Sequence, residues 1–384
     1  MKKLNKEKLE KLLRGRLERE IADYRVGAAH LLVLQDGKQV CSICEGYRNW
    51  DTKEPLGENT LYRLASMTKP VTAIATLIAE EKGYFSIHDL LSDHMPEFAE
   101  MYIAKEEDGQ IVPGEKSKVP LRIWHLLTHC NGVTANTEIG NRMEDAIPET
   151  AYQNLESAVA YVSKLPLTFE PESFSAYTAR LSFDIVARLI EIKSGMSYAQ
   201  FVQENIFNPL GLKDFTYYPT DEQWGRMLML TDRVGGPGLA TVNLGKHIFE
   251  AFPLSYTTAG AGLVASMADY AVFAEMLRNR GTYRGVQIVP EERFQEMVTP
   301  YVPRETPGRD PVSGWGLGVQ LVDGDGVLPK GTFGWSGAYG THFWVDPVNE
   351  ITAIYLRGSH WYDSHGCGMI GLQFEKDVAS CLED

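Results

Sequence analysis

A serine and a lysine three residues apart are the first residues in this sequence whose types and spacing could do covalent chemistry. They stand in the stretch ASMTKPVTA, residues 65–73, as Ser66 and Lys69. If both lie at the start of a helix, their side chains share one face and reach each other. A serine hydroxyl needs a base as it attacks, and lysine can serve once burial lowers its pKa. The pair indicates a nucleophile with its base, although Ser-x-x-Lys alone also fits a capping serine followed by a surface lysine.

Two later stretches add groups that such a nucleophile would use. ESFSAYTARLSFDIVARLIE places Tyr177 after a loop and just ahead of an amphipathic helix, and a phenol beside a lysine can hold or relay a proton. FGWSGAYGTHFWVDP contains Trp335, Ser336 and Gly337 on a late strand, where small residues would let a substrate backbone lie close. We expect these stretches to meet Ser66 in one cleft.

The elements that must position these residues come from both ends of the chain. Residues 27–47 indicate an antiparallel hairpin with its turn at Asp36-Gly37, and the apolar run 71–79 indicates a helix that stops at Gly83. Residues from about 85 to 245 are mainly helical in pattern, and strands return in GWGLGVQLV, GTHFWVDP and EITAIYLRG. The prediction is an α+β fold with an antiparallel sheet from both chain ends flanked by helices. Residues 1–85 and 246–384 would form the sheet lobe and residues 86–245 an inserted helical lobe, with the cleft between them.

The net charge and the N-terminal segment limit which partners and which cellular location we expect. The net charge of −14 disfavours nucleic acid and anionic membranes as partners. The lysine-rich start has no apolar run or cleavage site after it, and no stretch approaches the roughly 20 apolar residues of a membrane span, so we expect a cytoplasmic protein. Instead, apolar residues recur there at helical spacing and predict a helix packed on a core: Leu9, Leu12, Leu13, Leu17, Ile21 and Tyr24.

Cysteine and histidine patterns do not predict a metal site. Five scattered cysteines indicate reduced thiols, and Cys41 and Cys44 of CSIC sit in a strand-like stretch where they would point to opposite faces. His125 and His129 have the i, i+4 spacing of a zinc pair, but the adjacent glutamate of a zinc hydrolase and a third ligand are missing. We therefore expect two structural cysteines and a packed or capping histidine pair, with no metal and no cofactor.

Five motifs follow one another along the chain in the order of a known superfamily. They are LYRLASMTKPVTA, LRIWHLLTHCNGV, YTARLSFDIVARLIE, AGAGLVASMADYAVFAEML and WSGAYGTHFWVDP. On these motifs, the chain from about residue 25 onward resembles the serine beta-lactamase and penicillin-binding-protein-like superfamily. The resemblance is greatest to the class C-like branch, which includes the family VIII carboxylesterases, and it implies a beta-lactamase-like fold.

The resemblance also implies roles for individual residues. Ser66 would be the acylated nucleophile, Lys69 its base partner, and Tyr177 would assist proton transfer in acylation or deacylation. The backbone N–H groups of Ser66 and Ala338 would form the oxyanion hole, because Ala338 follows the triplet that matches the Lys-Thr-Gly or His-x-Gly position of the family.

Two departures from the class C pattern bear on the substrate. Ala179 replaces the asparagine of Tyr-x-Asn, and Trp335 replaces the lysine of Lys-Thr-Gly, as in family VIII esterases. With Ser336 and Gly337, these residues would contact the substrate, and the loss of a cation favours small uncharged esters. Alternatives are a beta-lactamase or D-amino-acid peptidase-like hydrolase acting on an amide, an acyltransferase of the same fold, and a non-catalytic scaffold. The sequence leaves open whether the chain forms a homo-oligomer.

Overall fold

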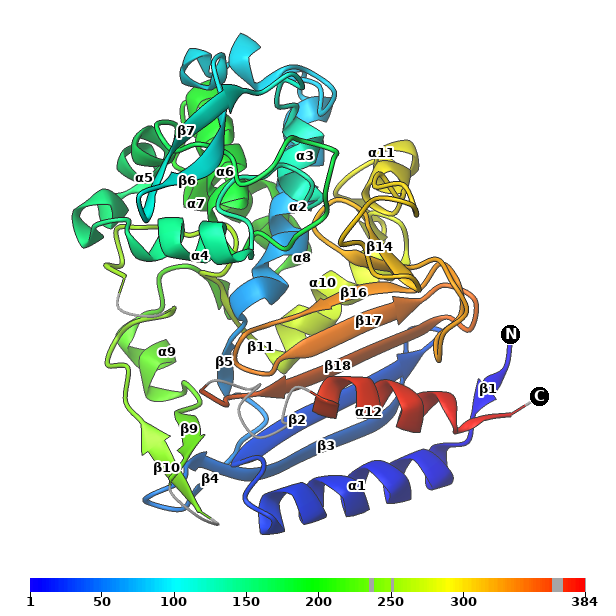
Figure 1. Cartoon of the computed structure of the whole chain (residues 1–384). Helices are drawn as coiled ribbons and strands as arrows, with labels where there is room; N and C mark the ends of the chain where they lie inside the picture. The colour runs from blue at the N-terminus through cyan, green and yellow to red at the C-terminus, as the bar shows by residue number, and fades with distance from the viewer. Residues whose placement is uncertain (235–237, 250–251, 361–368, 384) are drawn as a thin grey trace.

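An eight-stranded antiparallel sheet is the largest element of the protein (Figure 1). The computed structural model describes residues 1–234, 238–249, 252–360 and 369–383. Strands from the two chain ends pair within the sheet, with Leu356 of one strand opposite His30 of the other. In order across the sheet the strands are β14 (Ser313–Trp315), β15 (Gln320–Val322), β16 (Phe333–Ser336), β17 (His342–Asp346), β18 (Ile351–Arg357), β2 (Ala28–Gln35), β3 (Lys38–Asn49) and β4 (Glu54–Pro55). The predicted antiparallel sheet from both chain ends is confirmed.

The hairpin β2–β3 turns where the sequence predicts it. Asp36 and Gly37 are its two loop residues, and their φ angles are 52° and 68°. Two successive left-handed residues are the backbone that matches the right-handed twist of a tight hairpin, and Asp-Gly is well suited to it.

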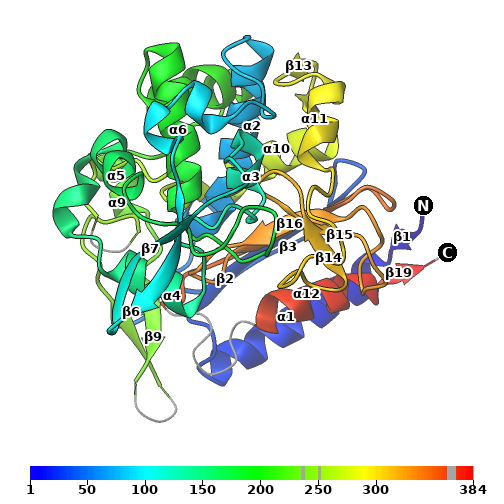
Figure 2. The same ribbon diagram turned by 45° about the horizontal axis from the view of Figure 1, so that its top comes forward.

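Two helices cover one face of the sheet (Figures 1 and 2): α1 (Lys6–Ala22) and α12 (Met369–Ala379). Leu9, Leu13 and Leu17 are buried there, which confirms the predicted helix and its buried side. The placement of Tyr24 on that helix is wrong. The helix ends at Ala22, and Tyr24 lies beyond it with φ 56° and 38% exposure, because the chain turns there to enter β2.

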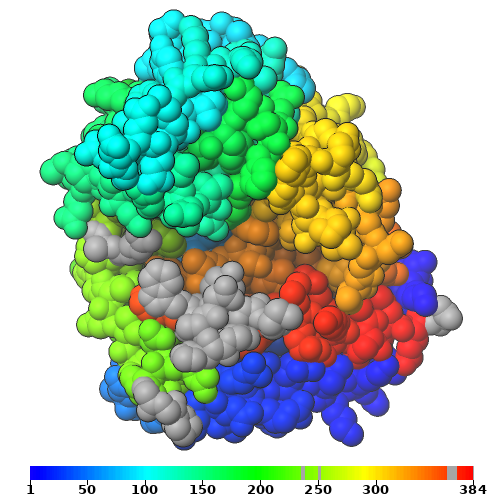
Figure 3. Space-filling view, viewed as in Figure 1, coloured from blue at the N-terminus to red at the C-terminus, as the bar shows by residue number. Residues whose placement is uncertain are grey.

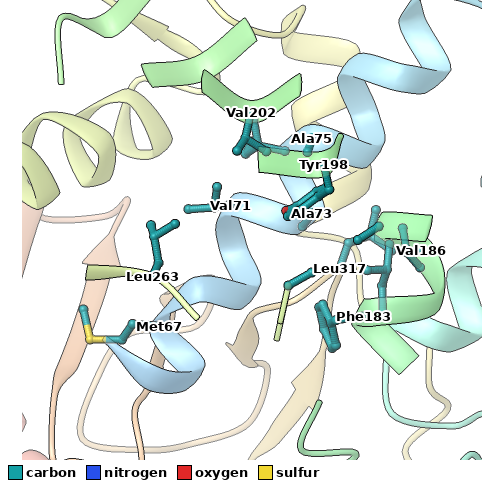
Figure 4. Packing of buried hydrophobic residues seen from close by; sticks show 14 of the residues in the cluster. Met67, Val71, Ala73, Ala75, Phe183, Val186, Tyr198, Val202, Leu263 and Leu317 are labelled. Atoms are coloured by element: carbon teal, nitrogen blue, oxygen red, sulfur yellow. The ribbon is translucent and has the colours of Figure 1, made fainter. Parts of the chain in front are cut away.

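The opposite face carries α10 (Met267–Arg278) and, farther out, the central helix α2 (Lys69–Glu81). All residues of α2 except the last are buried, because the helix lies between the sheet and the helical part of the chain. Figure 4 shows Val71 of α2 on the side of Leu263, and Ala73 on the side of Leu317 and Tyr198. The Gly83 stop is confirmed by its left-handed φ of 74°. Burial on every side fixes the N-terminus of α2, where Lys69 lies.

The remaining helices are short, apart from α6. They are α3 (Ile123–Leu127), α4 (Glu138–Asp145), α5 (Leu155–Val162), α6 (Leu181–Ser194), α7 (Tyr198–Val202), α8 (Asn208–Leu210), α9 (Asp221–Gly225) and α11 (Glu291–Met297). Within the described residues, no helix combines the length and apolar character that crossing a membrane requires.

Small sheets complete the fold, and some of them interrupt the region that the sequence indicates as mainly helical. Sequence reasoning missed the hairpin β6 (Tyr102–Glu107) and β7 (Gln110–Lys116), because its strands are largely exposed and lack apolar alternation. The lobe boundaries at residues 85 and 245 stay a prediction. The other short strands are β1 (Lys3–Leu4) with β19 (Leu382–Glu383), β5 (Leu61–Arg63) with β11 (Val264–Ser266) and β8 (Phe215–Thr216), β9 (Leu230–Arg233) with β10 (Leu239–Val242), and β12 (Thr282–Tyr283) with β13 (Val286–Gln287).

Candidate active site

Ser66 lies in a tight turn between β5 and α2. The turn is a 3₁₀ segment, Ala65–Thr68, and Ala65 has φ 45°, a left-handed conformation that costs a residue with a side chain about 1–3 kcal/mol. Hydrogen bonds to Leu64 hold the strained residue in place. The Leu64 N–H donates to the Leu263 carbonyl at 2.9 Å, and the Thr341 hydroxyl donates to the Leu64 carbonyl at 3.0 Å. The backbone of the predicted nucleophile is therefore fixed from both sides.

Lys69 begins α2 and is completely buried beside Ser66. Its Nζ lies 3.1 Å from Ser66 Oγ, 2.5 Å from the Ala179 carbonyl and 3.0 Å from the Gly260 carbonyl. Burial lowers the pKa of Lys69 to about 7, and the charge of Asp184 offsets only part of that effect. A neutral amine can give its two N–H groups to the carbonyls, which leaves its lone pair for the Ser66 hydroxyl proton.

Tyr177 completes a chain of hydrogen bonds in which each group donates to the next. Its hydroxyl lies 2.7 Å from Ser66 Oγ, and the Trp335 indole N–H donates to the Tyr177 oxygen at 3.2 Å. Burial raises the pKa of Tyr177 to about 12, so the phenol is protonated at neutral pH. Since an indole N–H can only donate, the Tyr177 proton points to Ser66 and the Ser66 proton is left for Lys69.

Two glycines allow separate segments to close around this cluster. A Cβ at Gly337 would lie 2.2 Å from both the Leu64 carbonyl oxygen and Thr341 Oγ1, so only glycine lets the end of β16 reach the nucleophile turn. A Cβ at Gly260 would lie 2.9 Å from the Cα of Arg180. Both contacts are much shorter than ordinary van der Waals distances, and either substitution would push a wall of the site away.

The backbone N–H groups of Ser66 and Ala338 lie at this junction of β16 and the nucleophile turn. Among the residues that the structure describes, neither group has a hydrogen-bond acceptor in the protein. Their predicted role as an oxyanion hole stays a prediction, and free donors are what that role requires.

His129 and Trp315 belong to the same cluster, and sequence reasoning did not place them there. The His129 ring centroid lies 4.6 Å from that of Tyr177 and 4.2 Å from that of Trp315, and Trp315 lies 4.5 Å from Trp335. His129 Nδ1 accepts the Thr178 N–H at 3.0 Å, and burial lowers its pKa well below the ordinary value, so the ring is neutral. These rings form an aromatic wall, defined here as His129, Tyr177, Trp315 and Trp335.

The two histidines of HLLTHC have separate structural roles, as predicted. His125 Nδ1 accepts the Arg122 N–H at the start of α3, and its Nε2 lies 2.9 Å from Glu172. His129 lies beyond the end of α3 and packs in the aromatic wall. The expected capping and packed pair is confirmed.

Asp184 is a buried carboxylate that sequence reasoning also missed. It lies in the first turn of α6 and accepts hydrogen bonds from the Ala259 N–H at 2.7 Å, from Thr258 Oγ1 and from the Tyr256 hydroxyl. These bonds tie the segment before Gly260 to α6, and so hold the Gly260 carbonyl against Lys69. The only signal in the sequence was one acid inside the apolar run LSFDIVARLIE.

The predicted substrate residues face different directions. Trp335, Gly337 and Ala179 reach the cluster through the contacts above, and Ala179 does so with its carbonyl. The Ser336 hydroxyl instead lies 2.8 Å from His342 Nδ1, and His342 Nε2 lies 3.0 Å from Glu375 of α12. Successive side chains of a strand point to opposite faces, so Ser336 faces away from the Trp335 side. A substrate contact of Ser336 stays a prediction.

A cavity of about 300 Å³ reaches Arg180, the residue that follows Ala179. Arg180 is paired with Glu144 at 2.6 Å, which balances its charge. Figure 3 shows this face of the molecule hollowed between the cyan and green upper part and the orange late strands. The volume suits a small ligand. The cavity is lined by Asn141, Glu144, Asp145, Ile147, Tyr152, Arg180 and Phe252.

Comparison with known proteins identifies one family and one fold. The model of the beta-lactamase family matches residues 9–358. Protein Rv1367c of Mycobacterium tuberculosis is 26% identical over 365 residues, which cover 88% of this chain and 87% of that protein. The structure of EstCE1, a hydrolase with promiscuous acyltransferase activity, superposes with TM-score 0.78 at 21% identity over 97% of this chain and 99% of that one. Unliganded simvastatin synthase LovD from Aspergillus terreus superposes with TM-score 0.78 at 18% identity over 97% and 98%.

Proposed function

The chain belongs to the beta-lactamase family, whose members are generally serine hydrolases, and we propose that it hydrolyses small uncharged carboxylic esters through an acyl-enzyme on Ser66. The observation that carries the proposal is the directed chain from Trp335 through Tyr177 and Ser66 to a buried Lys69. In the lobe division proposed from the sequence, Tyr177 comes from residues 86–245 and the other three from the sheet lobe.

Acylation would begin with attack of Ser66 Oγ on the ester carbonyl carbon, as the hydroxyl proton moves to Lys69 Nζ. The tetrahedral oxyanion would be stabilised by the N–H groups of Ser66 and Ala338. When the carbon–oxygen bond of the ester breaks, the departing alkoxide needs a proton. Tyr177 lies on the path to supply it and would be reprotonated from Lys69, so that the alcohol leaves and the acyl group stays on Ser66.

Deacylation would reverse these roles with water as the nucleophile. Water gives a proton toward Lys69 and attacks the acyl carbon, the bond to Ser66 Oγ breaks, and Ser66 regains its proton as the carboxylic acid is released. An alcohol in place of water would give transesterification by the same steps. This acyltransferase reaction is the second candidate, supported by the fold shared with EstCE1, described as a hydrolase with promiscuous acyltransferase activity.

Lys69 must be neutral to accept the serine proton, so its pKa sets the pH dependence. We expect kcat/KM for an ester to rise with pH through about 7 and then to level off, since Tyr177 keeps its proton until about pH 12. A profile that is flat from pH 5 to pH 9 would contradict the role of Lys69 as base.

The aromatic wall supports the choice of an uncharged substrate. The indole of Trp335 stands where the superfamily pattern has a lysine, and Trp315 packs against it at 4.5 Å. An aromatic surface favours apolar acyl or alcohol groups at about 25 cal/mol per Å² buried, whereas a carboxylate would lose water there without gaining a cation. Ala179 offers no side-chain amide for a peptide or lactam substrate.

The test is to measure kcat/KM for p-nitrophenyl acetate and butyrate and for penicillins and cephalosporins on one preparation. We expect the esters to be turned over far faster than the lactams. Lactam hydrolysis equal to or faster than ester hydrolysis would overturn the ester assignment and favour the lactamase alternative. Adding a small alcohol and quantifying new ester against free acid separates the acyltransferase from the hydrolase.

A further inference from the structure

A second cluster of reactive side chains lies on β2, β3 and the loop before β5. His30 of β2 is directly opposite Cys44 of β3, and Glu58 reaches them from the loop. One ligand atom from each of the three residues lies within 4.8 Å of the other two, and His30 Nε2 is 3.2 Å from Glu58 Oε2. Directly opposite residues of an antiparallel pair have Cβ atoms about 4.5–5.5 Å apart, which suits joint coordination of one ion.

Two buried polar groups at this cluster lack partners. His30 is 2% exposed, and among the described residues its Nδ1 has no hydrogen-bond partner. Tyr62 is fully buried and its hydroxyl also lacks a partner within the described part of the chain. Burial raises the pKa of the Tyr62 phenol, and the charges of Cys44 and Glu58 add to that effect. The ring nitrogen that faces Glu58 is Nε2, so Nδ1 is the atom at which water or another partner would hold a coordinating imidazole in place.

The local charge favours a cation. The Glu58 carboxylate has an oxygen within 4.8 Å of both the Cys44 thiol and the His30 ring. His30 Nε2 lies 3.3 Å from Ser42 Oγ as well as 3.2 Å from Glu58 Oε2. A divalent ion would relieve the repulsion between thiolate and carboxylate, and loss of the Cys44 proton would leave the ion with one thiolate and one carboxylate. The sum of charges at the site would then be zero.

We propose that His30, Cys44 and Glu58 bind one Zn²⁺ ion. Nitrogen, sulfur and oxygen donors together suit zinc, whereas magnesium and calcium require oxygen donors. Three protein ligands leave the fourth tetrahedral position for water, and the 76% exposure of the Glu58 side chain gives the ion a path from solvent. The sequence did not indicate this site, because its ligands share no helix and follow no zinc spacing.

Zinc at this position would tie the loop that carries Glu58 to the large sheet. That loop leads through β5 into the turn that holds Ser66. The ion lies outside the hydrogen-bond chain of the active site, so its expected effect is on the stability of the folded protein. A ligand that binds only the folded state stabilises it by mass action.

The chain offers a matched control for Cys44. Cys41 lies three residues earlier on β3 and belongs to the apolar cluster under α1, on the opposite face of the sheet. Both thiols are free, so Cys41→Ser and Cys44→Ser make the same chemical change on the same strand. Glu58→Gln tests the site at an exposed residue, where misfolding is not expected.

The experiment strips the full chain of metal with a chelator, adds Zn²⁺, and measures stoichiometry and affinity by competition with a chromophoric chelator. We expect one zinc ion per chain in the wild type and in Cys41→Ser. Cys44→Ser and Glu58→Gln should weaken binding by at least about tenfold, since even loss of an outer-shell partner costs 10–100-fold. Co²⁺ in place of zinc should give a thiolate charge-transfer absorption that Cys44→Ser removes. Absence of stoichiometric zinc binding, or equal binding by Cys41→Ser and Cys44→Ser, would overturn the proposal.

Discussion

The two faces of the eight-stranded sheet use their buried residues differently. Under α1 and α12 the buried side chains are mostly apolar, with Leu13 of α1 and Val33 of β2 in one cluster. On the other side, around the N-terminus of α2, the structure buries Lys69 completely, holds Ala65 at φ 45° and packs the neutral His129 beside them. The face under α1 and α12 is packed mainly by apolar contacts, and the other face holds, beside its own apolar cluster, groups that each cost folding free energy.

This difference between the two faces indicates where the fold can hold reactive groups. Burying a lysine without a carboxylate in contact lowers its pKa to about 7, and a left-handed alanine adds strain. Such features persist only where the surrounding structure holds them, and α2 is enclosed on all sides. Substitutions on the two faces should therefore separate activity from stability.

The largest expected effect is the loss of turnover in Ser66→Ala. Without the hydroxyl no acyl-enzyme forms, and ester turnover should fall by at least about 10⁴-fold while the protein stays folded. Lys69→Met should lose activity on a similar scale, and the double variant should be hardly worse, because residues that act as one unit are not additive. Turnover of p-nitrophenyl butyrate and circular dichroism check this. A folded Ser66→Ala that keeps a substantial share of the activity would disprove the assignment.

Tyr177→Phe should lower kcat by about 10²- to 10⁴-fold, the usual range for lost acid–base assistance. Phenylalanine keeps the ring contact with His129 and removes only the hydroxyl. The control is Tyr198→Phe. It removes a buried phenol that is hydrogen-bonded to Thr72 Oγ1 at 2.7 Å and has no contact with the nucleophile among the described hydrogen bonds. Tyr198→Phe should lose stability with kcat changed only a few-fold. Similar kinetics in both variants would assign Tyr177 to packing.

Leu13→Ala tests the other face. Leu13 is 1% exposed beneath α1, and its truncation should cost about 2–5 kcal/mol of unfolding free energy through lost burial and a cavity. The kcat per folded molecule should be unchanged. Urea unfolding gives the first quantity and active-site titration with ester turnover gives the second. A drop in kcat without a drop in stability would show that the two faces are not separable.

The smallest effect is a gain of stability in Lys69→Met, about 1–3 kcal/mol at pH 7. The lowered pKa costs the wild type about 5 kcal/mol, and the Ala179 and Gly260 carbonyls, which lose their donor in the variant, offset part of the gain. The folded pKa of Lys69, about 7, is below its unfolded value of about 10.5, so the unfolded chain binds more protons in this window. Wild-type stability should therefore rise with pH between 7 and 10.5 relative to Lys69→Met. Urea unfolding of both proteins across this range measures it. A stability difference that stays constant with pH would mean that Lys69 is not buried in its neutral form.

The sequence predicted the elements that depend on local pattern. The Asp36-Gly37 turn, the helix that stops at Gly83 and the buried side of α1 follow from residue spacing and turn chemistry, and all are confirmed. Tyr24 was misplaced because helical periodicity does not show where the chain must leave a helix. The resemblance to a known superfamily, stated from ordered motifs, grouped Ser66, Lys69 and Tyr177, and the structure places their side chains within hydrogen-bond distance. Their roles stay a proposal.

What the sequence could not supply are contacts between distant segments. Trp315 contacts Trp335 because the sheet places β14 and β16 on either side of β15. Asp184 accepts a hydrogen bond from Ala259, which is 75 residues away in the chain. His30, Cys44 and Glu58 are likewise assembled by strand register and a loop. No local period marks such residues, since each is ordinary in its own segment.

The most direct test of the central claim is mass spectrometry of the protein after reaction with a serine-directed fluorophosphonate. The account predicts one adduct per chain on the peptide that contains Ser66, no adduct in Ser66→Ala, and much slower labelling in Lys69→Met, where no base takes the serine proton. Labelling should also be faster above pH 7 than below it, because Lys69 must be neutral. An adduct on another residue, or labelling of Ser66→Ala at the wild-type rate, would contradict the account.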